Sequence, residues 1–380
     1  MNFSDPLPLA QALIRCPSVT PADAGAQGIL TEALAEAGFT VTKLRFGETD
    51  NFLARIGTGS PHFCFAGHTD VVPPGSGEWA HSPFEGVVAG DTLFGRGACD
   101  MKGAVAAFVA ACAAVEPDSV RGSLSLLITG DEEGDADDGT VRVVQALRDE
   151  GEVIDHCVVG EPSSLAKLGD QMKIGRRGSV SASIVVEGIQ GHVAYPERAA
   201  NPVPVLIRLL ERLQSRVLDD GYPEFPRSNL EVTTIDVGNA AGNVIPARAT
   251  ARLNIRFNPT HTGKALADWF QAECGKAGEG FKGTVSLKTK ISGEAFLTEP
   301  GDFVGVCSAA VREVTGLDPA LSTSGGTSDA RFIRSLCPVV ELGLVGATMH
   351  MVDECVPVEQ LRDLTKVYGR LIDRYFDTFA

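Results

Sequence analysis

The chain has 380 residues, of which 44% are hydrophobic and 22% are charged. This composition is typical of a globular protein and excludes a disordered chain. The formal net charge of −16 argues against nucleic acid or an anionic membrane as a partner, because these carry charge of the same sign. Small anionic substrates remain possible, since local arginines can bind them.

The cysteines and the apolar runs indicate the cellular compartment. The nine cysteines never form a Cys-x-x-Cys pair, so neither a disulfide framework nor a cysteine zinc site is predicted. Most lie in apolar segments and are expected to be buried free thiols. The longest nearly apolar run, 104–115, is shorter than the roughly 20 residues that cross a bilayer. The N-terminal segment lacks signal-peptide features, and we expect a cytoplasmic protein without a membrane partner.

The first part of the chain, to about residue 175, alternates strand-like apolar runs with helical patterns. Strands are predicted at 51–56, 62–66, 123–129 and 156–159. Helices are predicted at 28–37, 102–115 and 140–150. This alternation is typical of an α/β domain with a mostly parallel sheet.

The order of elements changes between residues 178 and 291. The patterns predict, in order, a strand at 180–187, a helix at 202–218, strands at 230–237 and 249–257, a helix at 263–274 and a strand at 284–291. This β-α-β-β-α-β order is ferredoxin-like. The chain then returns to helices and short strands, including a strand at 339–342, and ends in an amphipathic helix at 358–379. We therefore expect a domain 1–177 with 293–380, interrupted by a domain 178–292.

Charged residues occur where predicted elements begin or end. In FAGHTDVVPPG, His68 and Asp70 close an apolar strand and share one face of it. His68 could bind a metal while Asp70, or its backbone, orients the imidazole; the alternative is a strand-end histidine before a turn. Asp100 in GACDMKGA precedes a helical run, where it could be the helix N-cap or could reach a ligand site at the carboxyl edge of the sheet.

Further acidic residues follow other strands. In TGDEEG, Glu132 and Glu133 could have different roles, one as a metal ligand and one as a general base on water; a solvated acidic loop is the alternative. Glu161 in VVGEPS ends another strand, and His350 in GATMHMVDE precedes the last helix. Carboxylates and imidazoles without cysteine suit zinc or a similar ion in a hydrolytic site. Two such ions sharing a carboxylate recur in aminopeptidases.

These motifs resemble those of the M20 metallopeptidase family of di-zinc amidohydrolases, over nearly the whole chain. They are GHTDVVPPG, GRGACDMKGA, TGDEEG, VVGEPS, IGRRGS, GHVAYP, GNVIPA, LNIRFN, GGTSDARF and VVELGLVGATMHMVDECV. The resemblance implies a zinc-peptidase-like α/β catalytic domain with a mostly parallel central sheet, interrupted by an α+β ferredoxin-like lid domain. It also implies a homodimer whose subunits each hold two Zn²⁺, with Co²⁺ able to replace one.

The resemblance also implies the ligands of each ion. Asp100 would bridge the two metals, and the peptide bond that follows it would be cis. His68 and Glu161 would complete one site, and Glu133 and His350 the other.

The remaining site residues carry implied roles in catalysis and substrate binding. Glu132 would be the general acid and base, and Asp70 would be the partner of His68. His192, in the lid, would reach the active site of the other subunit, where it could bind the developing oxyanion. The implied substrate contacts are Arg176, Arg177, Tyr195, Asn243, Arg256, Gly326 and Thr327.

The function implied by the resemblance is amide hydrolysis in lysine and diaminopimelate biosynthesis. IGRRGS, GGTSDARF and MHMVDECV favour N-succinyl-LL-2,6-diaminopimelate as the substrate, whose carboxylates suit guanidinium groups. The nearest alternative is a related deacylase, acting on acetylornithine, on another acylated amino acid or on a dipeptide. A non-catalytic metal-binding or dimeric scaffold is a third hypothesis. Glu132 argues against it, because a structural site has no use for an extra unliganded carboxylate.

Overall fold

The computed structural model describes residues 4–115 and 120–380 of the chain. They form two compact units. Unit 1 takes the described residues of Met1–Gly175, Thr298–Ser322 and Ser328–Ala380, and unit 2 takes Arg176–Leu297 and Thr323–Thr327. Each unit has its own central sheet.

Unit 1 is built around an eight-stranded sheet with the order β1-β2-β6-β3-β7-β18-β8-β17. In that order the strands are Thr40–Phe46, Thr49–Gly57, Ser123–Thr129, His62–His68, His156–Val159, Val339–Glu341, Gln171–Lys173 and Ala320–Ser322. The pairs β6/β3, β3/β7, β7/β18 and β8/β17 are parallel, and the other neighbours are antiparallel. The predicted α/β class with a mostly parallel central sheet is confirmed.

Strands β3 and β6 lie in the middle of this sheet. Both are apolar over most of their length, and every residue of each is buried, as expected for strands covered on both faces. They pair in parallel from His62↔Ser123 to His68↔Thr129. The chain segments that follow them therefore leave the sheet at the same edge.

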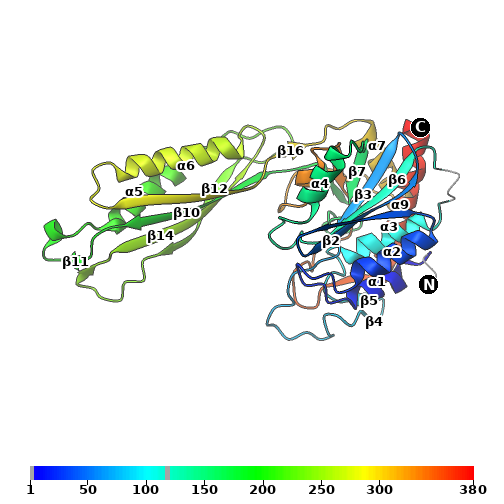
Figure 1. Ribbon diagram of the computed structural model, residues 1–380, viewed down its shortest axis with the longest axis horizontal. Coiled ribbons are helices and arrows are strands. Elements are labelled where there is room, and N and C mark those ends of the chain that lie inside the picture. The colour runs from blue at the N-terminus through cyan, green and yellow to red at the C-terminus, as the bar shows by residue number, and fades with distance from the viewer. Residues whose placement is uncertain (1–3, 116–119) are drawn as a thin grey trace. The chain divides into compact units, whose positions relative to one another are not determined.

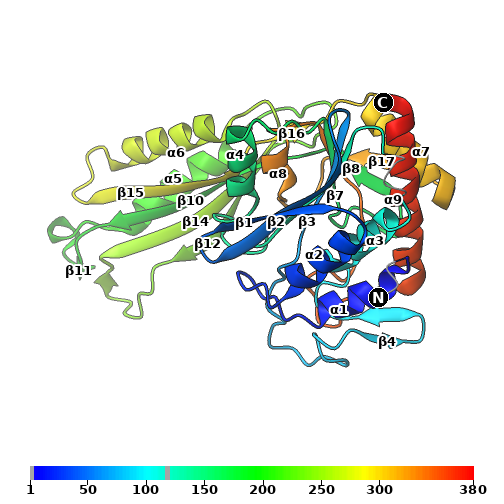
Figure 2. The same ribbon diagram turned by 45° about the vertical axis from the view of Figure 1, so that its right-hand side comes forward.

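Helices cover the sheet of unit 1. They are α1 (Pro6–Ile14), α2 (Ala26–Glu36), α3 (Lys102–Cys112), α4 (Thr140–Asp149), α7 (Asp302–Thr315), α8 (Ala330–Ile333) and α9 (Val358–Phe379). Helix α3 is buried on all sides and contacts α1 and α9, and α9 also contacts α7 (Figure 2). A small sheet is formed by β4 (Val87–Ala89), β5 (Thr92–Phe94) and β19 (Cys355–Pro357). None of the described helices is long and apolar enough to span a membrane.

Unit 2 is an antiparallel sheet, β12-β14-β10-β15, with α5 and α6 on one face (Figure 1). Its main elements are β10 (Gly178–Glu187), α5 (Pro202–Ser215), β12 (Asn229–Asp236), β14 (Arg248–Phe257), α6 (Gly263–Gly278) and β15 (Thr284–Gly293). Shorter elements are β9 (Gly175–Arg176), β11 (Gly191–His192), η2 (Pro196–Arg198), β13 (Val244–Ile245) and β16 (Phe296–Leu297). The predicted β-α-β-β-α-β order is confirmed.

Alternating burial along β10 and β14 explains this packing. Every second residue is buried in the middle of each strand, because successive side chains of a strand point to opposite faces. The buried face contacts Leu209 and Leu213 of α5 and Phe270 of α6.

The cysteines and the element boundaries test further predictions. All nine cysteines are free, and all except Cys355 are buried, so the prediction of buried thiols is confirmed for eight of them. The helix predicted at 202–218 ends at Ser215, and that at 102–115 ends at Cys112. The prediction missed β1, an edge strand that is largely exposed and carries polar residues, because it lacks an apolar run.

Candidate metal centre

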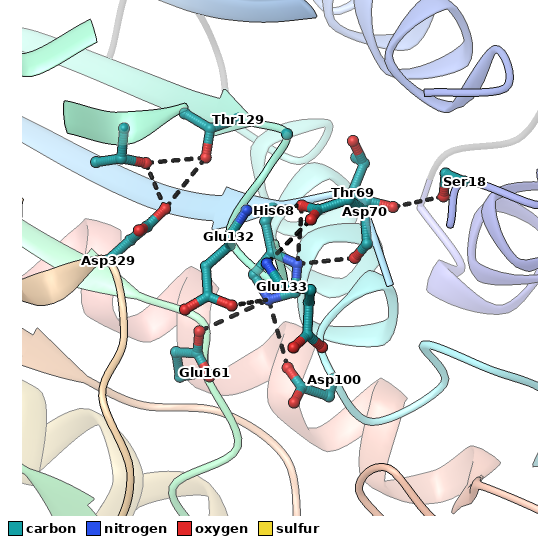
Figure 3. Close-up of polar contacts among 12 residues, drawn as sticks. Ser18, His68, Thr69, Asp70, Asp100, Thr129, Glu132, Glu133, Glu161 and Asp329 are labelled. Atoms are coloured by element: carbon teal, nitrogen blue, oxygen red, sulfur yellow. Dashed lines mark hydrogen bonds and ion pairs between the residues drawn. The ribbon is translucent and has the colours of Figure 1, made fainter. Parts of the chain in front are cut away.

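The carboxyl ends of three parallel strands bring most of the predicted ligands together in unit 1. His68 is the last residue of β3, Glu132 and Glu133 follow the end of β6, and Glu161 follows the end of β7. Because these strands are neighbours, their carboxyl ends form one edge of the sheet, where α/β proteins bind ligands. Asp100 joins them from the segment before α3, and Figure 3 shows the side chains directed toward one another.

His68 faces three carboxylates. Its Nε2 lies 3.4 Å from Asp100 Oδ1, 3.6 Å from Glu161 Oε1 and 3.9 Å from Glu132 Oε2. The imidazole is almost completely buried, so these carboxylates interact with it away from bulk water.

His350 approaches from the opposite side of Asp100. Its Nε2 lies 3.3 Å from Asp100 Oδ2 and 3.0 Å from Glu133 Oε1. Asp100 therefore turns one carboxylate oxygen toward each histidine, as a carboxylate shared by two sites must. His350 remains partly open, with 46% of its side chain exposed.

Two buried atoms without a hydrogen bond indicate that this donor set suits a cation. His68 Nε2 and Asp100 Oδ1 form no hydrogen bond among the described residues, although they lie 3.4 Å apart as an ion pair, and burying such atoms without hydrogen bonds is costly unless something else binds them. Two overlapping groups, His68/Asp100/Glu133 and His68/Glu132/Glu161, each have ligand atoms within 4.8 Å of one another. Imidazole and carboxylate ligands of this kind suit zinc and similar divalent ions, so the residues fit a metal centre.

Asp70 contacts the site through both its backbone and its side chain. Its backbone carbonyl accepts from His68 Nδ1 at 2.9 Å, whereas its carboxylate Oδ1 lies 3.6 Å from that atom. The carboxylate instead accepts the backbone N–H groups of Glu132 and Glu133, at 3.3 and 3.0 Å. Asp70 thus orients the imidazole through its carbonyl, and its side chain fixes the loop that carries both glutamates.

Charge interactions shift the pKa values of the histidines and of Asp100. Burial opposes protonation of His68, but the carboxylates around it outweigh burial and raise its pKa well above the usual value. Hydrogen bonds to Asp100 and Glu133 raise the pKa of His350 to about 10. Burial acts to raise the pKa of Asp100, yet the two histidines lower it overall. These shifts reflect the attraction between the two histidines and the carboxylates that face them.

The environment of Glu132 favours its protonated form. Burial, followed by the charge of Glu161, raises its pKa well above the usual value, and Asp329 contributes in the same direction. Asp329 is buried and accepts hydrogen bonds from Thr129 and Thr140 beside the loop that follows β6 (Figure 3). The sequence analysis did not identify Asp329, which belongs to the GGTSDARF motif.

The structure excludes the interpretation of Asp100 as the N-cap of helix α3. Met101, and not Asp100, occupies the N-cap position of α3, and no side chain caps this helix. The N-cap alternative is therefore wrong. The peptide bond between Asp100 and Met101 is cis, as the family resemblance implies.

Three arginines gather at one end of unit 2. Arg176 is buried and donates from Nη1 to the carbonyl of Gly326 at 2.5 Å, and Arg177 Nη1 donates to Asn229 Oδ1 at 2.9 Å. Asn229 pairs with Arg256 between β12 and β14. Burial lowers the pKa of Arg256, and the charges of Arg177 and Arg176 lower it further. Three guanidinium groups that lie this close together are suited to bind an anion.

His192, Tyr195 and Asn243 gather at another point of unit 2. His192 lies in β11, which pairs with β13, and its ring centroid is 5.9 Å from that of Tyr195. Val193 N–H donates to the carbonyl of Asn243 at 3.1 Å. The backbone N–H of Ala194 donates to His192 Nδ1 at 3.1 Å, so the neutral imidazole carries its proton on Nε2.

The two groups of unit 2 lie at opposite ends of one strand pair. Strands β10 and β14 pair from Gly178↔Phe257, beside the arginines, to Glu187↔Arg248, beyond which β11 and β13 follow (Figure 1). A strand of this length spans about 30 Å at roughly 3.3 Å per residue. The structure thus brings Arg176, Arg177 and Arg256 together with the segment that holds Gly326 and Thr327, and separates them from His192, Tyr195 and Asn243.

Comparisons with known proteins show which family and relatives the chain is similar to. The model of peptidase family M20/M25/M40 matches residues 64–374. The chain is 64% identical over 377 residues to the succinyl-diaminopimelate desuccinylase of Caulobacter vibrioides (strain NA1000 / CB15N), covering 99% of this chain and 97% of that protein.

Solved structures share the fold. The M20 family metallo-carboxypeptidase Sso-CP2 from Sulfolobus solfataricus has a TM-score of 0.80 at 17% identity, covering 97% of this chain and 99% of that one. The YXEP protein of Bacillus subtilis, described as a dinuclear metal-binding peptidase from the M20 family, has a TM-score of 0.74 at 14% identity, covering 98% of each chain.

Proposed function

The chain belongs to peptidase family M20/M25/M40, and on that premise we propose that it is a succinyl-diaminopimelate desuccinylase. It hydrolyses N-succinyl-LL-2,6-diaminopimelate to succinate and LL-2,6-diaminopimelate, in lysine and diaminopimelate biosynthesis in the cytoplasm. The observation that carries this proposal is the 64% identity to such an enzyme over 99% of the chain. The cluster of histidines and carboxylates in unit 1 supports it.

The metal centre would hold two divalent ions, with zinc in both positions and cobalt able to replace one. Asp100 would be shared by the two ions, a role supported by the direction of its two oxygens toward His68 and His350. His68 and Glu161 would complete one site, and Glu133 and His350 the other. The separations of 3.6 Å and 3.0 Å within these two pairs support this division.

Glu132 moves the proton that amide hydrolysis requires. Ions bound here act as Lewis acids on the amide carbonyl and make water nucleophilic at neutral pH. The Glu132 carboxylate accepts the proton of the attacking water and delivers it to the nitrogen of the leaving amine. Its raised pKa suits a group that must hold this proton, and Asp70 fixes the backbone N–H of Glu132.

His192 supplies an oxyanion donor to the site of a second subunit. Its Nε2–H is available because Nδ1 already accepts from Ala194, and such a donor stabilises the developing negative charge. Arg256 lies about 30 Å away along the same strand pair. One acylated amino acid cannot contact both residues within one chain. If both contact the substrate, they come from different chains of a homodimer.

The arginines bind the carboxylates of the substrate. Arg177 and Arg256 offer guanidinium groups that match a carboxylate in two-point contacts, and the effect of Arg177 and Arg176 on the pKa of Arg256 shows that their positive charges lie close together. Arg176 holds the carbonyl of Gly326 and adds positive charge to the group. The further substrate contacts are Tyr195, Asn243, Gly326 and Thr327.

A substrate comparison tests the proposed function. Purified protein, with its metal content measured, is assayed on N-succinyl-LL-2,6-diaminopimelate and on N-acetylornithine. We expect two ions per chain and a much larger kcat/KM on the succinylated compound. A larger kcat/KM on the acetylated compound would identify a related deacylase instead, and metal binding without turnover of either would favour the scaffold hypothesis.

A further inference from the structure

Glu354 is a fully buried carboxylate that no catalytic role accounts for. It accepts four hydrogen bonds, which use both of its oxygens. Oε1 accepts the backbone N–H groups of Cys99 and Asp100 at 3.0 and 3.2 Å, and Oε2 accepts the N–H of Gly97 at 3.0 Å and Arg96 Nη1 at 2.8 Å. Glu354 thus binds the backbone of the segment that ends at Asp100.

Arg96 extends this contact to two other loops. Its side chain is buried, and Nη1 also donates to the carbonyl of Met351 at 3.2 Å while Nη2 donates to that of Pro73 at 3.4 Å. Its guanidinium lies over the ring of Trp79, at 5.2 Å from the centroid. One buried ion pair therefore joins the loops that precede α3, follow β3 and precede β19.

We propose that Glu354 and Arg96 are positioning residues that set the distance between Asp100 and His350. The inference rests on the proposed role of these two residues as metal ligands. Glu354 binds the N–H of Asp100 itself, and Arg96 binds the carbonyl of Met351, the residue after His350. His350 has a φ of 62°, which is uncommon for a residue other than glycine. Contacts from outside its loop, such as that of Arg96, therefore help to hold the backbone of His350 in this conformation.

The chemistry requires a carboxylate at position 354. Each oxygen of Glu354 accepts two hydrogen bonds. In Glu354→Gln one of these oxygens becomes an NH₂ group, which would face two donors instead of accepting from them. Glu354→Gln would also leave the Arg96 charge buried and unpaired, which is unfavourable. Residues that support metal ligands in this indirect way typically change metal affinity by about 10- to 100-fold when they are replaced.

Metal titration of the full chain tests the proposal. Metal-free wild type and Glu354→Gln are titrated with Zn²⁺ against a chelator, and Co²⁺ spectra report the coordination of the bound ions. We expect Glu354→Gln to bind at least one ion, the one held with His350, about 10- to 100-fold more weakly and to change the Co²⁺ spectrum. Glu152→Gln is the control, because it breaks the half-buried ion pair between Arg55 and Glu152, whose atoms lie 2.7 Å apart. This pair lies beside His62, the first residue of β3, whereas the metal centre lies at the last residue of that strand. Glu152→Gln should lower the melting temperature and leave both metal affinities unchanged.

The outcomes separate the proposal from the proposed function. Wild-type affinity for both ions in Glu354→Gln would overturn the positioning role alone. Fewer than two ions in wild type would overturn the metal centre itself. If Glu354→Gln does not fold, Arg96→Lys replaces it, since lysine keeps the charge beside Glu354 but cannot bind Met351 and Pro73 as well. Weaker binding of one ion in a folded Arg96→Lys supports the proposal, and unchanged binding overturns it.

Discussion

Subunit mixing tests whether His192 acts across a dimer. Within unit 2, the strand pair places His192 about 30 Å from the arginines near Arg256, a distance set by the ten-residue strands β10 and β14. His192→Ala should lose about 10²- to 10³-fold in kcat, as expected for an oxyanion donor. Glu132→Gln should lose about 10²- to 10⁴-fold, as expected for a general acid and base.

Mixing the two variants should restore activity by a predictable amount. In a mixed dimer, one site combines Glu132 of one chain with His192 of the other and is intact, whereas the second site lacks both. Random exchange makes half of the dimers mixed, so about a quarter of the wild-type activity per site should return, as two-fold symmetry requires.

Turnover is measured after dissociation and reassociation, with exchange monitored by tagged chains. The matched control mixes Glu132→Gln with Asp100→Ala. Both residues lie in unit 1 and act in the site of their own chain, so every site of a mixed dimer lacks one of them. This mixture should regain nothing. If exchange occurs and the His192→Ala mixture also regains nothing, the trans role of His192 is refuted.

Three further predictions concern the ions and the substrate. Asp100→Ala should lose both ions and His350→Ala should mainly lose one, as measured by metal titration; near-normal binding of two ions by Asp100→Ala would contradict a bridging role. Arg256→Lys should raise KM for the succinylated substrate, because lysine lacks the forked guanidinium, and should affect an acyl group without the distal carboxylate less; equal effects on both substrates would place Arg256 elsewhere. The His350 pKa of about 10 means that a metal ion displaces a proton from His350 at neutral pH. Affinity should therefore rise as the pH rises from neutral toward about 10, and calorimetry in several buffers should detect fewer protons released per bound ion for His350→Ala; equal release per ion would refute this.

Much of the site in unit 1 could be predicted because its residues lie at or directly after the ends of apolar strands. The runs at β3, β6 and β7 are strong local patterns, and the parallel strands of an α/β sheet bring their carboxyl ends to one edge. His68, Glu132 and Glu161 could therefore be expected together without a structure. Helix α9 was equally clear, since its apolar residues recur at helical spacing.

The supporting contacts could not be predicted, because they join residues distant in sequence. Glu354 contacts the backbone near Asp100 across more than 250 residues, and Asp329 contacts Thr129 across 200. Neither contact leaves a periodic pattern in the sequence. Asp70 was expected to orient the imidazole through its side chain or its backbone, and the sequence could not distinguish the two because the side-chain position depends on where the loop after β6 turns.

The most direct test of the central claim is the metal content and turnover of Glu132→Gln, measured on one preparation. We assign Glu132 to proton transfer and not to metal binding. Glu132→Gln should therefore keep two bound ions and lose about 10²- to 10⁴-fold in kcat on N-succinyl-LL-2,6-diaminopimelate. Glu132 Oε2 lies 3.9 Å from His68 Nε2, so the competing role is that of a metal ligand. Loss of an ion in step with activity would establish that role, and wild-type turnover would exclude Glu132 from the chemistry.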